Sequence, residues 1–181
     1  MARLRYLDPE DLADGDRDLL ARRNNLFRAL VNSPEALRHF RFGHWIRFES
    51  TVDPRLREMA ILQVGHAARQ PYEWSHHIRV GREFGVTEDD VRAIMADSAG
   101  EESTLSPLER AVLAAARQME RDGRIDEATF ATLNEGLGAD QVVQLVLAIA
   151  HYCGVVRILT ALEIDVEPEY QTYLEQFPLP G

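Results

Sequence analysis

Cysteine is nearly absent from this chain of 181 residues, in which Cys153 is the only one. A single thiol excludes a disulfide within the chain. It also excludes chemistry in which one cysteine attacks a substrate and a second cysteine of the same subunit resolves the product. Such low cysteine usage is typical of a reducing compartment. We therefore expect a cytoplasmic protein without a disulfide framework.

The sequence also lacks an excess of positive charge and a long uninterrupted apolar run. Asp and Glu outnumber Lys and Arg by 30 to 20, which gives a formal net charge of −10. Nucleic acids and anionic membranes attract Lys and Arg, so neither is an expected partner. The N-terminus has no apolar stretch of the signal-peptide type. The longest apolar run, residues 142–156, contains Gln144 and His151 and is too short to span a bilayer, so we expect a buried helix there.

Signals for β-strands are missing as well, because no segment shows strict alternation or a cluster of β-branched residues. Helical periodicity runs through almost the whole chain. With 45% hydrophobic residues and a length that suits one buried core, we predict a single all-α domain of about eight helices over residues 1–181. Residues 1–30 would form an N-terminal helical extension. The polar residues 97–105 would form a surface linker between two helical halves.

Proline and capping residues mark the expected helix boundaries. The strongest local signal is Ser106-Pro107-Leu108-Glu109, a capping box with proline at the first helical position. Gly136 and Gly138 should end one helix before the long apolar one begins. The expected helices cover about 16–30, 54–68, 71–85, 107–122, 127–135 and 140–162, with shorter ones after Ser33, Thr87 and Glu167.

In place of a second thiol, the chain offers a glutamate and a histidine four residues apart. Glu73 and His77 share one stripe of the helix predicted at 71–85. A carboxylate against an imidazole sets its tautomer and raises its basicity, as a proton-transfer residue requires. A Glu–His pair at this spacing is also ordinary helix support, and Glu35 with His39 repeats it. The spacing alone leaves both interpretations open.

Residues near this pair complete the candidate site. Glu58 lies on the preceding helix, on a face that would bring it within reach of His77, although it could instead pair with Arg55 at the surface. Tyr72, Trp74 and His66 are candidates to line a substrate pocket.

Arginines near the candidate site could hold a substrate carboxylate bidentately. They are Arg57, Arg79 and Arg82. Surface solvation is the alternative role for each of them.

The same residue types raise the question of a metal site. Glu58, Glu73, His66, His76 and His77 include the ligands that zinc and iron prefer. Adjacent histidines on a helix diverge, however, and the chain has no second Glu-x-x-His copy. We therefore predict no metal and no cofactor.

Three segments of the sequence resemble a known family. They read Arg57-Glu58-Met-Ala-Ile-Leu, Tyr72-Glu73-Trp74-Ser-His-His77 and Phe84-Gly85-Val86-Thr87-Glu88. In these stretches the chain resembles the carboxymuconolactone decarboxylase family, which includes alkylhydroperoxidase D. His151-Tyr152 in the long apolar helix and the closing Leu162-Glu-Ile-Asp165 look like the second half of the same family.

The resemblance implies a role for each candidate residue. His77 falls on the family histidine and Glu58 on the glutamate that relays protons. Gln70 and Glu73 occupy the two positions of the Cys-x-x-Cys pair of the peroxidase branch. Without these thiols the chain looks closer to the decarboxylase branch, whose cofactor-free reaction removes carbon dioxide from a carboxylated lactone. His77 would then protonate carbon, with Glu73 and Glu58 orienting it.

The leading hypothesis is a small acid–base lyase or isomerase for a carboxylated or lactone-like metabolite. By family, an alkylhydroperoxidase or peroxiredoxin-like antioxidant protein is an alternative, and a non-catalytic ligand-binding oligomer is another. Family members typically form trimers or hexamers, so the resemblance also implies a homo-oligomer with a small-molecule substrate.

Overall fold

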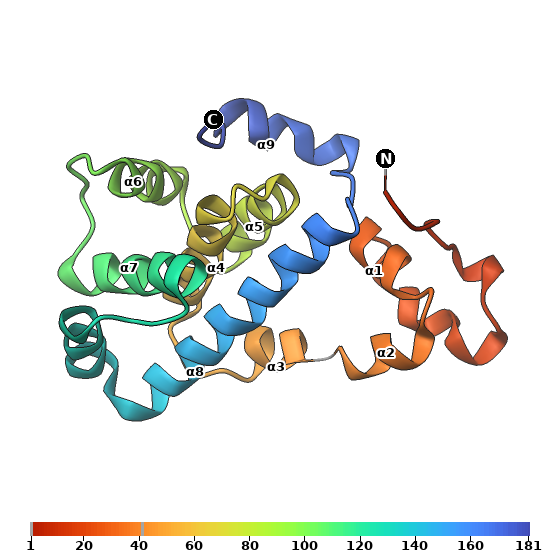
Figure 1. Ribbon diagram of the computed structural model, residues 1–181, viewed down its shortest axis with the longest axis horizontal. Helices are drawn as coiled ribbons and strands as arrows, with labels where there is room; N and C mark the ends of the chain where they lie inside the picture. Colours follow the sequence, from red (N-terminus) through yellow and green to blue (C-terminus); the bar gives the residue numbers. More distant parts are fainter. Residues whose placement is uncertain (1, 41) are drawn as a thin grey trace.

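The structure is a computed structural model that describes residues 2–40 and 42–181, and none of these residues forms a β-strand. The α-helices, drawn in Figure 1, confirm the all-α prediction. They are α1 (Asn25–Leu30), α2 (Pro34–His39), α3 (Phe42–Phe48), α4 (Pro54–Ala67), α5 (Pro71–Glu83), α6 (Glu88–Ala99), α7 (Pro107–Asp122), α8 (Glu127–Ala161) and α9 (Gln171–Gln176). Short 3-10 helices cover Pro9–Asp11, Asp14–Leu20 and Pro168–Tyr170.

Side-chain caps fix the starts of the longer helices. Asp53, Thr87, Ser106 and Asp126 each accept a hydrogen bond from the backbone amide three residues later. At Thr87 and Ser106 the bond is reciprocated, which makes two complete capping boxes. Each such cap stabilises its helix by about 1 kcal/mol. The helix starts predicted from these residues are confirmed.

The N-terminal extension differs from the single helix predicted at about 16–30. A 3-10 helix ends at Leu20, and α1 begins only at Asn25. The side chain of Asn24 accepts a hydrogen bond from the amide of Phe27 at 2.9 Å, so Asn24 starts a new helix instead of continuing the old one. Residues 21–24 therefore form a connecting segment between the two helices, and residues 21–23 are exposed.

Gly100 and Gly123 end α6 and α7, and Gly138 interrupts α8. Gly100, with φ +78°, ends α6, so the linker begins there and not at residue 97. The run called α8 contains a break at Gly138, where φ is +74° and ψ is 165°. The two helices predicted on either side of the glycines are thus present and meet at this kink.

The C-terminal part of α8 is a core helix. By length and composition alone α8 could cross a membrane, with a mean hydropathy of 1.9 and 44% of its apolar window buried. The 35 residues of α8, which include the break at Gly138, extend beyond the apolar run at 142–156. Leu145, Ile149 and Val156 pack in one apolar cluster with residues of α4 and α7. Core helices of soluble proteins pass the same length test, and the packing places α8 among them.

Helix α4 lies at the centre, in contact with α5, α6, α7 and α8. Every residue from Leu56 to His66 is buried, including Arg57 and Glu58. In Figure 1, α4 and α5 lie next to each other beside the long diagonal of α8. Charged groups on so buried a helix need partners within the protein. Arg57 and Glu58 therefore require oppositely charged or polar groups nearby.

Gly65 allows α4 and α5 to approach closely. A methyl group added there would lie 3.1 Å from the backbone nitrogen of Trp74 and 3.3 Å from Cγ of Glu73. We expect Gly65→Ala to strain this contact by about 1–3 kcal/mol, against a gain in helix propensity of about 1 kcal/mol. The net result should be a free energy of unfolding about 1 kcal/mol lower, measured by urea denaturation.

Gly154 provides the matched control on α8. It is exposed, and a methyl group there would meet nothing within 4 Å. Gly154→Ala should therefore raise the free energy of unfolding by up to about 1 kcal/mol. Equal effects of the two substitutions would contradict the close approach of α4 and α5.

Candidate functional site

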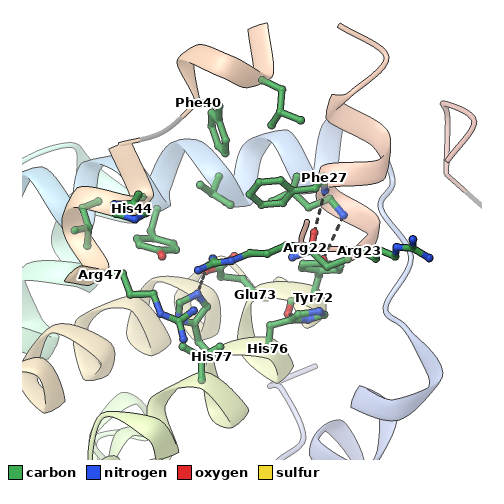
Figure 2. Close-up of a pocket in the computed structure, with 18 of the residues that line it drawn as sticks. Arg22, Arg23, Phe27, Phe40, His44, Arg47, Tyr72, Glu73, His76 and His77 are labelled. Carbon is green, nitrogen blue, oxygen red and sulfur yellow. Dashed lines mark hydrogen bonds and ion pairs between the residues drawn. The ribbon is translucent and has the colours of Figure 1, made fainter. Parts of the chain in front are cut away.

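A cavity of about 770 Å³ lies where five parts of the chain meet. Its wall is built by the N-terminal segment with α1 to α3, by α4, by α5, by α8 and by the segment around Tyr170. Figure 2 shows this cavity in close-up, with Glu73 and His77 side by side within it. Glu58, Glu73 and His77 all contribute to the lining.

His77 is held between two carboxylates. Its Nδ1 lies 2.8 Å from Oε2 of Glu58 on α4, in a hydrogen bond, and its Nε2 lies 3.0 Å from Oε1 of Glu73 one turn earlier on α5. Oε1 of Glu73 forms no aligned hydrogen bond within the described residues, so its contact with His77 is an ion pair by distance. The predicted meeting of these three residues is confirmed.

Arg57 supports the carboxylate of Glu58 from behind. Its guanidinium lies 3.3 Å from Oε1 of Glu58, and both side chains are only 2% exposed. The same guanidinium packs over the ring of Phe84, 4.9 Å from its centroid. Surface solvation of Arg57 and a surface pair between Glu58 and Arg55, the two alternatives to a role in the site, are thus wrong. Arg55 instead forms ion pairs with Asp90 and Glu109.

The two carboxylates make His77 a strong base. Burial alone would lower the pKa of His77, but the charges of Glu73 and Glu58 and their contacts with the ring raise it to about 10. Burial likewise favours a protonated Glu58, yet the hydrogen bond from His77 and the charges of His77 and Arg57 hold the pKa of this carboxyl below its usual value. At neutral pH the imidazole is therefore charged and carries a proton on each nitrogen.

Tyr152 and His151 form the opposite wall, on α8. The ring of Tyr152 meets the ring of His77 edge-on, with centroids 5.0 Å apart. Burial, followed by the charges of Glu73 and Glu58, raises the pKa of Tyr152 well above its ordinary value. Burial lowers the pKa of His151, which is neutral at pH 7. Neither residue was predicted to line the cavity, and the only indication in the sequence is a pair of polar groups within an apolar run.

Tyr72 and His76 line a different part of the cavity. Tyr72 was predicted there. The His76 ring is stacked between Tyr72 and Tyr170, with centroids 3.8 and 3.6 Å away. Its Nδ1 lies 2.9 Å from the carbonyl oxygen of Tyr72, and its Nε2 lies 3.1 Å from the carboxylate of Glu167. His76 thus fastens the C-terminal segment to α5.

Trp74 and His66 do not line the cavity, and that prediction is wrong. Trp74 is fully buried, and its Nε1 donates a hydrogen bond to the carbonyl of Phe177 at 2.8 Å. His66 packs edge-on against Trp74, with ring centroids 5.1 Å apart. Consecutive residues of a helix point about 100° apart, so the neighbour of a cavity residue readily faces the core.

The candidate ligands do not assemble into a metal site. Within residues 2–40 and 42–181, no group of three or more His, Cys, Asp or Glu side chains is placed to hold a metal ion. Both nitrogens of His77 face carboxylates, and those of His76 face Tyr72 and Glu167. The arrangement around His77 suits proton transfer.

The one thiol lies elsewhere. Cys153 is buried and is absent from the cavity wall. Burial, together with the hydrogen bond and negative charge of Glu120, raises the pKa of the Cys153 thiol to about 12. It therefore stays protonated and unreactive at neutral pH.

Known proteins share the fold of this chain. The chain is similar to a crystal structure described as an alkylhydroperoxidase AhpD core, an uncharacterized peroxidase-related protein from Ralstonia eutropha, with a TM-score of 0.77 and 19% identity over 93% of this chain and 94% of that one. It is also similar to a protein of unknown function from Agrobacterium tumefaciens, named as a candidate antioxidant defence protein AhpD, with a TM-score of 0.66 and 18% identity over 75% of this chain and 93% of that one. At these identities the likeness concerns the fold.

No curated protein matches the chain. The model of the carboxymuconolactone decarboxylase family matches residues 32–118, a segment that contains Glu58, Glu73 and His77. The chain thus has an alkylhydroperoxidase D-like fold, and its residues 32–118 are similar to the carboxymuconolactone decarboxylase family.

Proposed function

We propose that the protein is a cofactor-free acid–base enzyme, a lyase or isomerase that acts on a small carboxylated or lactone-like molecule. The observation that carries this proposal is His77, held between Glu58 and Glu73 at the wall of a cavity that the only thiol does not reach. A charged imidazole between two carboxylates can store a proton and pass it on without any other group.

The geometry supports a definite proton route. In a decarboxylation, the bond between carbon and the carboxylate breaks, carbon dioxide leaves, and the electron pair moves into a conjugated carbonyl group. The proton on Nε2 of His77 passes to Glu73 across 3.0 Å and from there to the carbon. Glu58 holds the other nitrogen at 2.8 Å and keeps the ring in place. Solvent then restores the proton of His77.

An arginine in the cavity is consistent with a substrate that carries a negative charge. Arg22 lines the cavity and forms no ion pair with any residue that the structure describes. In Figure 2 its side chain runs into the cavity toward Glu73 and His77, while the side chain of Arg23 points away. A guanidinium matches a carboxylate with two parallel hydrogen bonds. Arg22 is therefore suited to hold the carboxylate of the substrate.

The alternative functions make different demands on the site. An antioxidant function, which the names of the structural neighbours suggest for those proteins, would here depend on Cys153. A ligand-binding protein would use the cavity without turnover. The expected homo-oligomer stays a prediction, for which the exposed apolar side chains of Phe48, Val143 and Leu147 offer surface.

Turnover assays separate these functions. We expect the wild-type protein in deuterium oxide to release carbon dioxide from, or incorporate deuterium into, one or more members of a panel of carboxylated lactones and β-keto acids. Organic hydroperoxides should be consumed no faster than in buffer. The Cys153→Ser variant should keep the lyase activity, because its side chain lies outside the cavity wall. Hydroperoxide consumption that disappears in Cys153→Ser would overturn the proposal in favour of a peroxidase.

A further inference from the structure

Three tyrosines line the cavity, and two of them use their hydroxyl groups within the protein. The hydroxyl of Tyr72 accepts a hydrogen bond from the amide of Leu26 at 3.3 Å and donates one to Glu167 at 3.4 Å. The hydroxyl of Tyr170 accepts a hydrogen bond from Arg79 at 3.1 Å. The hydroxyl of Tyr152 has no hydrogen-bond partner in the part of the chain that the structure describes.

Packing accounts for the ring of Tyr152 but not for its hydroxyl. The ring meets His77 and His151 edge-on, with centroids 5.0 and 5.3 Å away. A phenylalanine would make both contacts equally well. Tyr152 is only partly buried and lines the cavity. Its hydroxyl, which no group of the described residues engages, is therefore available to a molecule in the cavity.

The charges around Tyr152 keep its proton in place. Glu73 and Glu58 face it from α5 and α4, and with burial they raise its pKa well above 10, while Arg47 and Arg57 oppose them less strongly. Tyr152 is thus a neutral O–H group beside a carboxylate and a charged imidazole. A fixed neutral donor next to a proton-transfer pair is the arrangement that stabilises negative charge as it develops on a substrate oxygen.

We propose that Tyr152 is a catalytic residue that donates a hydrogen bond to the carbonyl or enolate oxygen of the substrate while Glu73 and His77 exchange a proton with the neighbouring carbon. This inference rests on the proposed function and narrows it to substrates whose reacting carbon is conjugated to a carbonyl group. When the carbon–hydrogen or carbon–carboxylate bond breaks, the electron pair moves onto that oxygen. The phenol keeps its proton throughout.

The Tyr152→Phe variant tests the inference, because it removes only the hydroxyl. We expect its Tm to be equal to or above that of the wild type, since no hydrogen bond within the protein is lost. For any substrate that the wild type converts, kcat should fall about 100-fold with little change in KM. Tyr72→Phe is the matched control for stability, and its Tm should fall because Leu26 and Glu167 lose their partner.

A binding assay keeps the test independent of turnover. The probe is 4-nitrophenolate, a flat oxyanion whose absorbance shifts when it accepts a hydrogen bond. Its affinity should be about ten-fold lower in Tyr152→Phe than in the wild type. If the wild type turns over no substrate but binds the probe more tightly than Tyr152→Phe does, the proposed function is refuted while the donor role of Tyr152 is supported. A lower Tm in Tyr152→Phe, or unchanged kcat and probe affinity, would overturn the inference.

Discussion

Replacing His77 by glutamine is expected to lower the free energy of unfolding by about 3–5 kcal/mol at pH 7. The substitution removes the cation between Glu58 and Glu73 and leaves two buried carboxylates in one space. Glutamine fills much of the imidazole volume, so the loss reports mainly on charge. Urea denaturation followed by far-UV circular dichroism measures the effect.

His39 provides a control at the same spacing. It lies 3.2 Å from Glu35, four residues earlier, but these side chains are 79% and 78% exposed. His39→Gln should change the free energy of unfolding by less than about 0.5 kcal/mol. Similar losses for the two substitutions would contradict the buried ion-pair arrangement around His77.

The difference between wild type and His77→Gln should also depend on pH. The pKa of His77 is about 10 in the folded protein, above its ordinary value of 6.5. Its stabilisation is therefore complete below about pH 6.5, declines as the pH rises and is lost above about pH 10. Glu58, whose pKa is lowered from 4.5, contributes above pH 4.5 and loses its contribution as the pH falls. The difference should be largest between about pH 4.5 and 6.5.

Replacing Glu73 by glutamine is expected to lower kcat/KM by about 10²–10⁴-fold. The amide has the shape of the carboxylate but cannot carry the proton from His77 to the substrate. The variant also loses the strongest influence that raises the pKa of His77, which should therefore fall. Steady-state kinetics measures the first effect and NMR titration of the His77 ring the second.

Glu35→Gln is the control for this prediction, because Glu35 is exposed and lies outside the cavity wall. It should leave both kcat/KM and the pKa of His77 unchanged. If Glu73→Gln keeps full activity while the pKa of His77 falls, His77 must protonate the substrate directly, and the route through Glu73 is wrong.

Local chemistry made much of the fold predictable. The caps at Asp53, Ser106 and Asp126 act on amides three residues away, so they are visible in a short stretch of sequence. The pair Glu73–His77 is similarly local, because one helical turn brings the two residues together. The break before α1 was not predicted because the helical periodicity of the sequence continues across Asn24. In the structure Asn24 caps a new helix.

The parts of the site that were not predicted depend on distant segments. Tyr152 meets His77, seventy-five positions away in the chain, because α5 and α8 both pack against α4. Arg22 lies in an N-terminal segment between two helices and lines the cavity. Sequence periodicity does not predict where such a segment lies in the fold. Trp74 was misplaced because sequence spacing indicates which residues share a face but not which face meets the cavity. Packing between elements decides these points.

The set of Arg57, Glu58, Glu73 and His77 restricts how such a site can evolve. Its two carboxylates and two cations sum to zero charge, and none of the four side chains is more than 12% exposed. Replacing one of these four residues by an uncharged residue leaves one charge unbalanced. We therefore expect that in related sequences two of these positions, one acidic and one basic, change together. Placing a cysteine at position 73 would remove a negative charge as well as add sulfur. Gaining thiol chemistry at this position would therefore require a compensating change among the buried charges.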